Sequence, residues 1–268
     1  MVRVIGVGDN TVDKYLHLRQ MFPGGNAVNV AVLAHRYGHP ASYIGWFGND
    51  RYGDLLIDAL ENEKIDTTHC RIVDGTNAHG DVSLIDGERV FGHSDHGVTT
   101  LIALTEEDLE FISQHQLTHT SIYSYIGSDI QKLSEASTCL SFDFSQDWTR
   151  EYLSEILPWI HIAILSYPDC SEAETEDLMS WIYNQGPKVV LITQGKLGAV
   201  LFDGISISRQ GIVETNVVDT LGAGDAFAAR FLVEYLEGTP AEMALQKAAI
   251  SAAETCGYYG AFEHGVAY

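Results

Sequence analysis

The chain has 268 residues, and 46% of them are apolar, which is enough to build one large α/β domain or one domain with a small appendage. It carries 37 acidic and 15 basic residues, for a formal net charge of −22. This balance argues against binding to nucleic acid or to an anionic membrane, because both require a basic surface. No apolar run approaches the roughly 20 residues of a membrane span, and we do not expect the N-terminal residues to be a signal peptide.

The spacing of cysteines and histidines predicts neither a zinc site nor a redox pair. Cys70, Cys139, Cys170 and Cys256 are far apart in the sequence, so we expect free thiols in a reducing, cytoplasmic setting. The eleven histidines form no His-Glu-x-x-His pattern, and we expect most of them on the surface or in loops.

The first expected strand, residues 2–8, leads into a segment with two carboxylates, Asp9 and Asp13. Ligands of a parallel sheet gather at the carboxyl ends of its strands. Both side chains are therefore candidates for holding a substrate, since a carboxylate can accept hydrogen bonds from two neighbouring sugar hydroxyls. The alternative is an ordinary turn rich in Asp and Asn.

A Gly-Gly turn follows. Gly24 and Gly25 lead directly into an Ala- and Val-rich helix, which we expect over residues 26–34. Glycine lets a ligand approach the backbone closely, and Asn29 offers that ligand a side-chain amide. A further strand is expected over residues 41–46.

Residues 76–97 contain two short alternating stretches joined by Asp86 and Gly87, which is a strong hairpin signal. Together with residues 11–22, this hairpin is a candidate lid, a small β-sheet that would exclude water from a reaction. Arg89 in the hairpin is a candidate contact for a substrate or a phosphate. The alternative is that its side chain faces solvent.

From residue 105 onward, expected strands and helices alternate, which is the pattern of a doubly wound parallel sheet. Capping signals at Thr105 and Ser171 predict two helix starts, and a third helix is expected to begin at Thr239-Pro240 with Glu242 completing a capping box. The expected strands are residues 121–125, 139–144, 161–166, 188–193 and 199–202.

A second glycine turn, Gly222-Ala223-Gly224, precedes Asp225 and a helix rich in Ala, Phe and Leu, and residues 217–218 before it are expected to be extended. The N–H groups of the turn lie at the positive end of the helix with no large side chain above them, which favours binding of an oxyanion or phosphate. Asp225 beside them is a candidate general base. Transfer of a phosphoryl group to a hydroxyl requires this combination. The alternative is a tight turn in which Asp225 only caps the helix.

Three segments, in this order, resemble the PfkB/ribokinase family of sugar and nucleoside kinases. Residues 24–34 are similar to its first signature, residues 193–198 (Thr-x-Gly-x-x-Gly) to its nucleotide loop, and residues 219–225 (Asp-Thr-Leu-Gly-Ala-Gly-Asp) match its second signature without a departure. The resemblance covers essentially the whole chain. It implies a single ribokinase-like α/β domain over residues 1–268, with a doubly wound, mostly parallel sheet, helices on both faces and a small β lid.

The resemblance implies an ATP-dependent sugar kinase. Asp225 would be the catalytic base, and the amides of Gly222, Ala223 and Gly224 would hold the transferring charge. The lid would cover the sugar, and family members often pair through it as homodimers. The expected substrate-binding residues are Asp9, Asp13, Gly24, Gly25, Asn29 and Arg89, and the expected ATP-binding residues are Thr193, Gly195, Gly198, Gly222 and Gly224.

The resemblance also implies metal ions. Mg²⁺ would bridge the ATP phosphates, and the family usually carries Asn-x-x-Glu to help hold it through water. Glu172 matches this pattern, but Asp169 replaces the Asn, which weakens the assignment; the alternative is a helix start enriched in acidic residues. A monovalent cation such as K⁺ would lie beside Asp219.

Several stretches, among them residues 8–13 and 141–148, look like the family members that phosphorylate the 6-hydroxyl of fructoselysine, a fructosamine. A negatively charged protein also suits a substrate with an ammonium group. Two alternatives stay open: a kinase of fructose, ribose or a nucleoside such as adenosine, and a non-catalytic sugar-binding protein on the same fold. A dinucleotide oxidoreductase is disfavoured, since residues 6–9 lack the third glycine of that motif.

Overall fold

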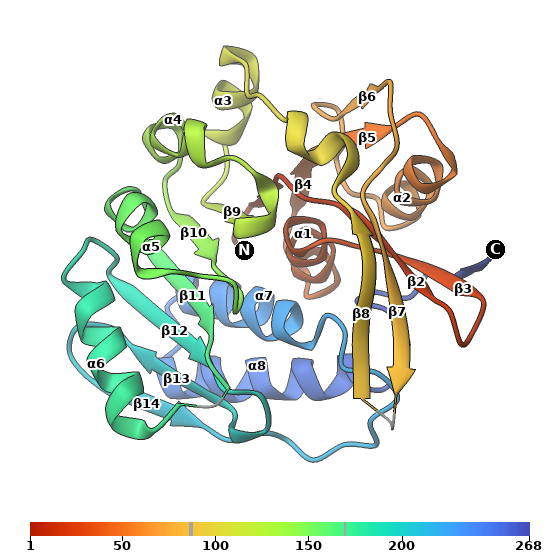
Figure 1. Cartoon of the computed structure of the whole chain (residues 1–268). Helices are drawn as coiled ribbons and strands as arrows, with labels where there is room; N and C mark the ends of the chain where they lie inside the picture. Colours follow the sequence, from red (N-terminus) through yellow and green to blue (C-terminus); the bar gives the residue numbers. More distant parts are fainter. Residues whose placement is uncertain (86–87, 169) are drawn as a thin grey trace.

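The computed structural model describes residues 1–85, 88–168 and 170–268, and it contains one large sheet with helices on both faces and a smaller sheet beside it (Figure 1). The hairpin turn expected at Asp86 and Gly87 lies outside the described residues, as does Asp169. Within the described ranges, no helix is long and apolar enough to cross a bilayer.

The large sheet has eight strands. From one edge to the other they are β14 (Ile207–Gln210), β13 (Ala199–Phe202), β12 (Val189–Thr193), β11 (Ile162–Ser166), β10 (Leu140–Asp143), β9 (Leu117–Ser121), β1 (Val4–Val7) and β4 (Ala41–Ile44). All neighbours from β12 to β4 are parallel, and β13 and β14 are antiparallel additions at one edge. The expected doubly wound, mostly parallel sheet is confirmed.

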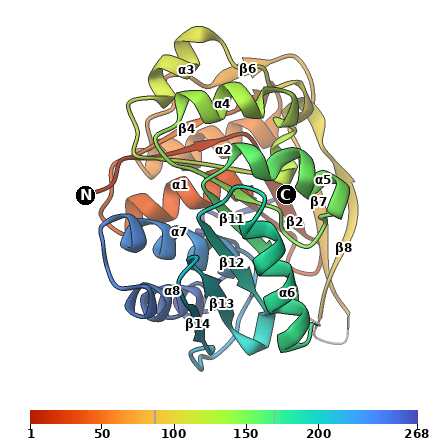
Figure 2. The same cartoon turned by 90° about the vertical axis from the view of Figure 1, so that its left-hand side faces the viewer.

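Helices cover both faces of this sheet. One face carries α1 (Asn26–Arg36), α2 (Arg51–Asn62), α7 (Ala223–Leu236) and α8 (Ala241–Thr255), and the other carries α3 (Glu106–Ile112), α4 (Ile130–Ala136), α5 (Arg150–Ile156) and α6 (Glu172–Tyr183). Figure 2 shows α6 and α8 on opposite sides of the strands between them. Because neighbouring residues of a strand face opposite ways, Ile164 of β11 packs in one apolar core and Leu165 in the other.

A second sheet has five strands: in spatial order β15 (Val266–Ala267), β3 (Gln20–Gly24), β2 (Thr11–Tyr15), β7 (His79–Ile85) and β8 (Glu88–Asp95). β2 and β3 form one antiparallel hairpin, β7 and β8 form another, and β2 pairs in parallel with β7. Four of these strands, β2, β3, β7 and β8, lie in or overlap the two segments expected to form the lid, and β15 was not expected there. β5 (Trp46–Gly48) and β6 (Arg71–Val73) make a separate two-stranded sheet.

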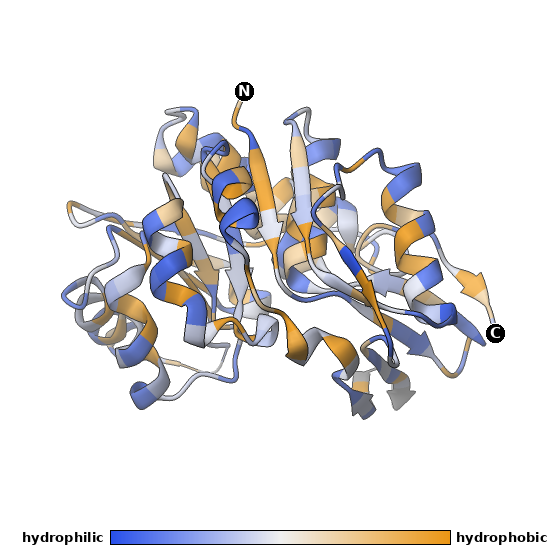
Figure 3. Ribbon diagram, turned by 90° about the horizontal axis from the view of Figure 1, so that it is seen from above, coloured by the Kyte–Doolittle hydropathy of each residue, from blue (hydrophilic) through white to orange (hydrophobic). Residues whose placement is uncertain are grey.

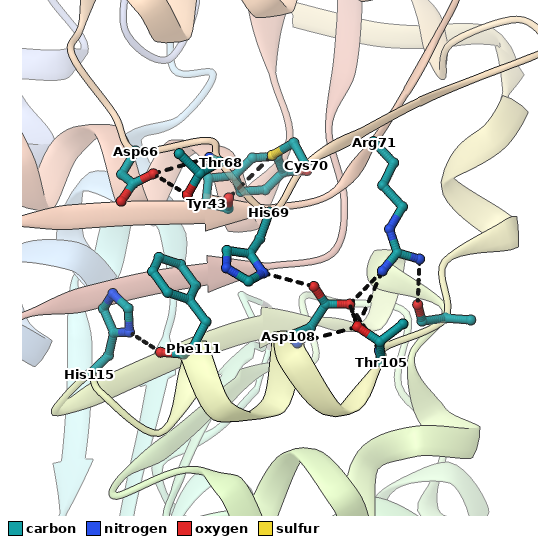
Figure 4. A network of polar contacts seen from close by, with 11 residues as sticks. Tyr43, Asp66, Thr68, His69, Cys70, Arg71, Thr105, Asp108, Phe111 and His115 are labelled. Atoms are coloured by element: carbon teal, nitrogen blue, oxygen red, sulfur yellow. Dashed lines mark hydrogen bonds and ion pairs between the residues drawn. The ribbon is translucent and has the colours of Figure 1, made fainter.

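The start of α3 is fixed by the expected capping box, which is confirmed. Thr105 Oγ1 accepts a hydrogen bond from the Asp108 amide, and the Asp108 carboxylate accepts one from the Thr105 amide. That carboxylate also lies 3.0 Å from His69 Nδ1 and accepts a hydrogen bond from Arg71 Nη2 at 2.8 Å (Figure 4). Burial would raise the pKa of Asp108, but these hydrogen bonds and the Arg71 charge hold it below its ordinary value. One buried carboxylate therefore ties α3 to β6.

Two further capping boxes that the sequence predicts have different outcomes in the structure. Ser171 and Glu174 form the capping box expected at α6, which is confirmed. The capping box expected for the last helix is wrong, since α8 begins at Ala241 without a side-chain cap. The reason is local: the Thr239 hydroxyl donates a hydrogen bond to Glu234 instead of accepting one from α8.

One expected strand is also misplaced. The segment 121–125 is wrong as a strand, because β9 ends at Ser121, whose side chain caps a short 3₁₀ turn. Tyr125 then follows in the left-handed region with φ 55°. The extended entry expected before the second glycine turn does not join a sheet: the Val218 amide bonds to the Cys256 carbonyl at 2.8 Å.

Polar and apolar residues alternate around most helices, as the hydropathy colouring in Figure 3 shows. The pattern agrees with helices that bury one side against the sheet. All four cysteines have free thiols, as expected. His39, His115 and His119 depart from the general expectation for histidines because they are buried.

Candidate active site

Asp225 lies in the first turn of α7, directly after the second glycine turn. Gly222 at the N-cap has φ 76°, and a Cβ there would meet the Ala261 Cβ at 2.4 Å, so only glycine fits. A Cβ on Gly224 would meet no atom within 4 Å, so this side of the turn is open. The first N–H groups of a helix lack helical partners and favour an anion. The amide of Ala223 is the exception, since it bonds to the Thr220 carbonyl at 3.3 Å.

Two asparagines of α1 hold the Asp225 carboxylate. Asn29 Nδ2 donates to Oδ2 at 2.5 Å, and Asn26 Nδ2 donates to Oδ1 at 2.8 Å. Burial raises the pKa of Asp225 from 3.8 to about 7, and the negative charges of Asp143 and Asp9 add to this effect, while the two asparagines oppose it. A carboxylate with a pKa near neutrality is well matched to take a proton from a hydroxyl.

Asn29 also offers an unused acceptor. Its Oδ1 is buried and has no hydrogen-bond partner within the described part of the chain. A Cβ placed on Gly24 would lie 2.8 Å from Asp13 Oδ2 and 3.8 Å from Asn29 Oδ1, so both side chains converge above this glycine. An unpaired buried carbonyl oxygen is unfavourable, and the hydroxyl of a bound sugar would supply the missing donor.

Asp9, an expected substrate contact, makes several hydrogen bonds within the chain. Its carboxylate accepts hydrogen bonds from the Asn26 amide at 2.5 Å, Ser121 Oγ at 2.7 Å and Ser124 Oγ at 2.8 Å. It therefore fixes the start of α1. Gly25 also belongs to the start of α1, and only glycine fits there, because its φ is 114° and a Cβ would meet Asn10 Cα at 2.6 Å. These contacts give Asp9 and Gly25 structural roles and leave Gly24 as the glycine that faces the open side.

The expected nucleotide loop follows β12, at the edge of the sheet where β10 ends in Asp143. Thr193 ends the strand and donates a hydrogen bond to the Leu165 carbonyl at 3.3 Å. A Cβ on Gly198 would meet the Gln210 carbonyl at 2.0 Å, so this glycine is required by packing. A Cβ on Gly195 would have only Pro168 nearby, at 3.8 Å, and that backbone is open to a ligand.

The structure describes two of the three expected metal ligands, Glu172 and Asp219. The described residues include no group of three or more His, Cys, Asp or Glu side chains that could hold a metal ion. Glu172 is exposed at the start of α6, and its Oε1 lies 2.7 Å from Arg209 Nη2. Asp169 lies outside the described residues. A single exposed carboxylate fits a contact to Mg²⁺ through water better than a direct ligand.

Asp219, expected beside a monovalent cation, is buried and accepts hydrogen bonds. The amides of Leu221 and Gly260 donate to it at 3.1 Å each, and the Tyr15 hydroxyl donates to Oδ2. The carboxylate thus connects β2 to the glycine turn and to the C-terminal segment. Arg89, an expected substrate contact, has its backbone in β8, and its side chain lies outside the described part of the chain.

Three polar residues that sequence reasoning missed complete the site. Asn26 Nδ2 donates to Asp143 Oδ2 at 2.9 Å as well as to Asp225, and Asn26 Oδ1 lies 2.8 Å from His119 Nε2. Burial raises the pKa of Asp143 to about 6. Asp143 stands at the end of a parallel strand, and the rule that singled out Asp9 would have found it. His119 lies inside a buried strand and gives no such signal.

Comparisons with known proteins give the family of this chain. A family model described as pfkB family carbohydrate kinase matches residues 1–264. The chain is 41% identical to fructosamine kinase FrlD of Bacillus subtilis, covering 100% of this chain and 95% of that protein. It is 37% identical to fructoselysine 6-kinase of Escherichia coli, covering 96% and 98%.

Solved structures agree on the fold. A ribokinase of Arabidopsis thaliana in complex with ribose and ATP has a TM-score of 0.84 at 22% identity, covering 98% of this chain and 95% of that one. A ribokinase II of E. coli in complex with ATP and Mg²⁺ has a TM-score of 0.82 at 19% identity, covering 98% and 96%.

The large parallel sheet, the small sheet beside it and the glycine turn before Asp225 define an α/β protein of the ribokinase-like class. The chain belongs to the pfkB family of carbohydrate kinases. It is an ATP-dependent sugar kinase, a phosphotransferase with an alcohol group as acceptor.

Proposed function

We propose that this kinase transfers the γ-phosphoryl group of ATP to the 6-hydroxyl of a fructosamine, with fructoselysine as the representative substrate. The observation that carries the substrate class is the 37–41% identity, over nearly the full length of each chain, to a fructosamine kinase and a fructoselysine 6-kinase. The charge of the site supports it: among the contacts of the described residues, Asp9, Asp143 and Asp225 have only neutral donors. An ammonium group on the substrate would compensate this local negative charge.

In the proposed reaction, Asp225 accepts the proton of the 6-hydroxyl. The sugar oxygen forms a bond to the γ-phosphorus, the bond from that phosphorus to the β,γ-bridging oxygen breaks, and ADP leaves with the electron pair. The amides of Gly222 and Gly224 stabilise the charge that develops on the transferring group, and the Ala223 amide can join them by giving up its 3.3 Å bond to the Thr220 carbonyl. Asn29 Oδ1 and Asp13, which converge above Gly24, orient the sugar hydroxyls.

ATP would lie over the loop of Thr193, Gly195 and Gly198, where Gly195 leaves the backbone open. Mg²⁺, when bound, neutralises charge on the phosphates, and Glu172 is suited to hold it through water. A monovalent cation beside Asp219 stays a prediction, because the Asp219 oxygens already accept three donors. Replacing KCl by tetramethylammonium chloride in the assay tests it: a loss of activity restored by K⁺ supports the cation, and unchanged activity removes it.

We propose that the five-stranded sheet is the lid of a single kinase domain, that two copies pair through it, and that the enzyme acts in the cytoplasm, where ATP is available. β8 is an edge strand of this sheet, and an edge strand presents unpaired backbone groups to a partner. Light scattering during gel filtration tests the pairing: a dimer mass supports it, and a monomer mass at assay concentrations excludes it.

The experiment that tests the function is ADP release with ATP and Mg²⁺ across fructoselysine, other fructosamines, fructose, ribose and adenosine. Turnover that is at least tenfold higher in kcat/KM for the fructosamines supports the proposal. Preferential turnover of a plain sugar or of adenosine would keep the kinase chemistry and overturn the substrate class.

A further inference from the structure

Two acidic groups of the site, Asp143 and Asp225, share one hydrogen-bond donor. Asn26 Nδ2 lies 2.9 Å from Asp143 Oδ2 and 2.8 Å from Asp225 Oδ1, so these two oxygens are no more than 5.7 Å apart. Asn26 is the first residue of α1, Asp143 ends β10 and Asp225 lies in the first turn of α7. The Asn26 amide therefore stands between two carboxylates that come from different parts of the fold.

His119 fixes the orientation of the Asn26 side-chain amide. Nδ1 of His119 lies 2.8 Å from Ser141 Oγ, and Nε2 lies 2.8 Å from Asn26 Oδ1. The imidazole is fully buried, and burial lowers its pKa to about 3, so it is neutral and carries one N–H. Asn26 Oδ1 is an acceptor, so the proton is on Nε2 and Nδ1 accepts a hydrogen bond. The Ser141 hydroxyl then points to Nδ1 at 2.8 Å and not to the more distant Thr118 carbonyl at 3.2 Å. The Nδ2 end of Asn26 consequently faces the two carboxylates.

We propose that Asn26 is a positioning residue for the phosphoryl transfer: its amide separates Asp225 from Asp143, and His119 holds that amide with its donors toward both carboxylates. This inference rests on the proposed role of Asp225 as the base. The physical reason is that two neighbouring carboxylates without a donor between them repel or share a proton. A shared proton would leave Asp225 unable to accept another one.

The other groups near Asp225 do not provide this function. Asn29 of α1 holds the opposite oxygen, Oδ2, and makes no bond to Asp143 in the described structure. Asp9, after β1, adds negative charge. The charged residues farther along α7, Arg230 and Glu234, pair with each other, and Lys247 of α8 pairs with Glu234. Asn26 is thus the donor that serves both carboxylates.

The test is the pH dependence of kcat/KM with ATP, Mg²⁺ and fructoselysine, or the preferred sugar of the panel above. Asn26→Ala keeps the backbone bond from residue 26 to Asp9, so α1 should still start correctly. We expect its acid limb to move up by about one pH unit, with about a fivefold loss of kcat/KM at pH 7, about a tenfold loss at lower pH and recovery at higher pH. In the double variant Asn26→Ala/Asp143→Asn, the acid limb of the pH profile should return toward its original position, since the negative charge of Asp143 no longer repels that of Asp225.

His119→Phe should produce a smaller shift in the same direction, and His115→Phe provides the matched control. His115 is also buried and hydrogen-bonded through both ring nitrogens, but its partners are Ser42 and Phe111, away from the site. A uniform loss of activity at every pH in Asn26→Ala, or a higher KM with an unmoved limb, would overturn the inference. So would equal profiles for the two histidine variants.

Failure of the inference and failure of the proposed function are distinguishable. If Asp225→Asn keeps its activity, the proposed base is wrong and the role of Asn26 falls with it. If Asp225→Asn is inactive while Asn26→Ala keeps the original acid limb, only the positioning role is wrong.

Discussion

Asp225→Asn should change activity and stability in opposite directions. The substitution removes the group that we propose accepts the hydroxyl proton, and loss of a general base typically costs about 10² to 10⁴ in rate. In the unmodified enzyme, kcat/KM should fall about tenfold for each pH unit below about 7, because the carboxylate must be ionised to act and its pKa is raised to about 7. This acid limb should disappear in the residual activity of the variant.

The stability effect follows from the same pKa. A carboxyl whose pKa is raised in the folded state contributes stability below its unfolded pKa, and this contribution is lost as the pH rises through the folded pKa. The rise from 3.8 to about 7 corresponds to about 4 kcal/mol at pH 8, and solvent that reaches the half-buried side chain reduces this to about 2 kcal/mol. The Asn variant should be more stable by about that amount at pH 8. Asn29 can accommodate the new amide by turning its unpaired Oδ1 toward it.

The assays are ADP release and urea unfolding, each at pH 6 and pH 8. Asp108→Asn is the matched control, because it removes a buried carboxylate that is far from the site and has a lowered pKa. It should lose stability and keep its activity. An Asp225→Asn protein that is as active as the original, or that is less stable at pH 8, would refute the reasoning about Asp225.

Three more outcomes are expected. Asp108→Asn should lower the free energy of unfolding by about 1–3 kcal/mol at pH 7, and the difference should vanish as the pH falls through the pKa of the folded state, in urea titrations at several pH values. Gly222→Ala should destabilise by more than about 2 kcal/mol, because strain at φ 76° adds to a 2.4 Å approach to Ala261, whereas Gly238→Ala, at φ 84° with open space around it, should cost only about 1 kcal/mol in thermal melts. Asn29→Ala should raise the KM for the sugar more than the KM for ATP, and equal effects on both would contradict its assignment to the sugar.

The fold was predictable because its signals are local. Buried strands such as residues 188–193 are continuous apolar runs, and capping pairs such as Thr105 with Asp108 involve residues three apart. The strand expected over residues 121–125 failed for a local reason as well: Ser121 is a good cap, and it starts a 3₁₀ turn where β-branched and aromatic residues suggested extension.

The site was predictable at its glycine turns and only in part at its polar residues. Gly222 and Asp225 follow one another in the sequence, so their pattern is visible. Asp143 and His119 reach Asn26 from 117 and 93 residues away, and no spacing rule connects them. Asp9 was expected at the substrate because it follows a strand, and the sequence gives no sign that its carboxylate also accepts hydrogen bonds from the first amides of α1.

The first turn of α1 explains how these parts act together. Residues three apart on a helix lie on the same face, so Asn26 and Asn29 reach the two oxygens of Asp225 at once. That register depends on where α1 begins, and Asp9 and the left-handed Gly25 fix this point. The spacing of the two asparagines is therefore a requirement of the reacting carboxylate, although in the sequence it looks like an ordinary helix start. Asp9, whose carboxylate accepts hydrogen bonds from the first amides of α1, would then affect the reaction by setting the position of both asparagine side chains.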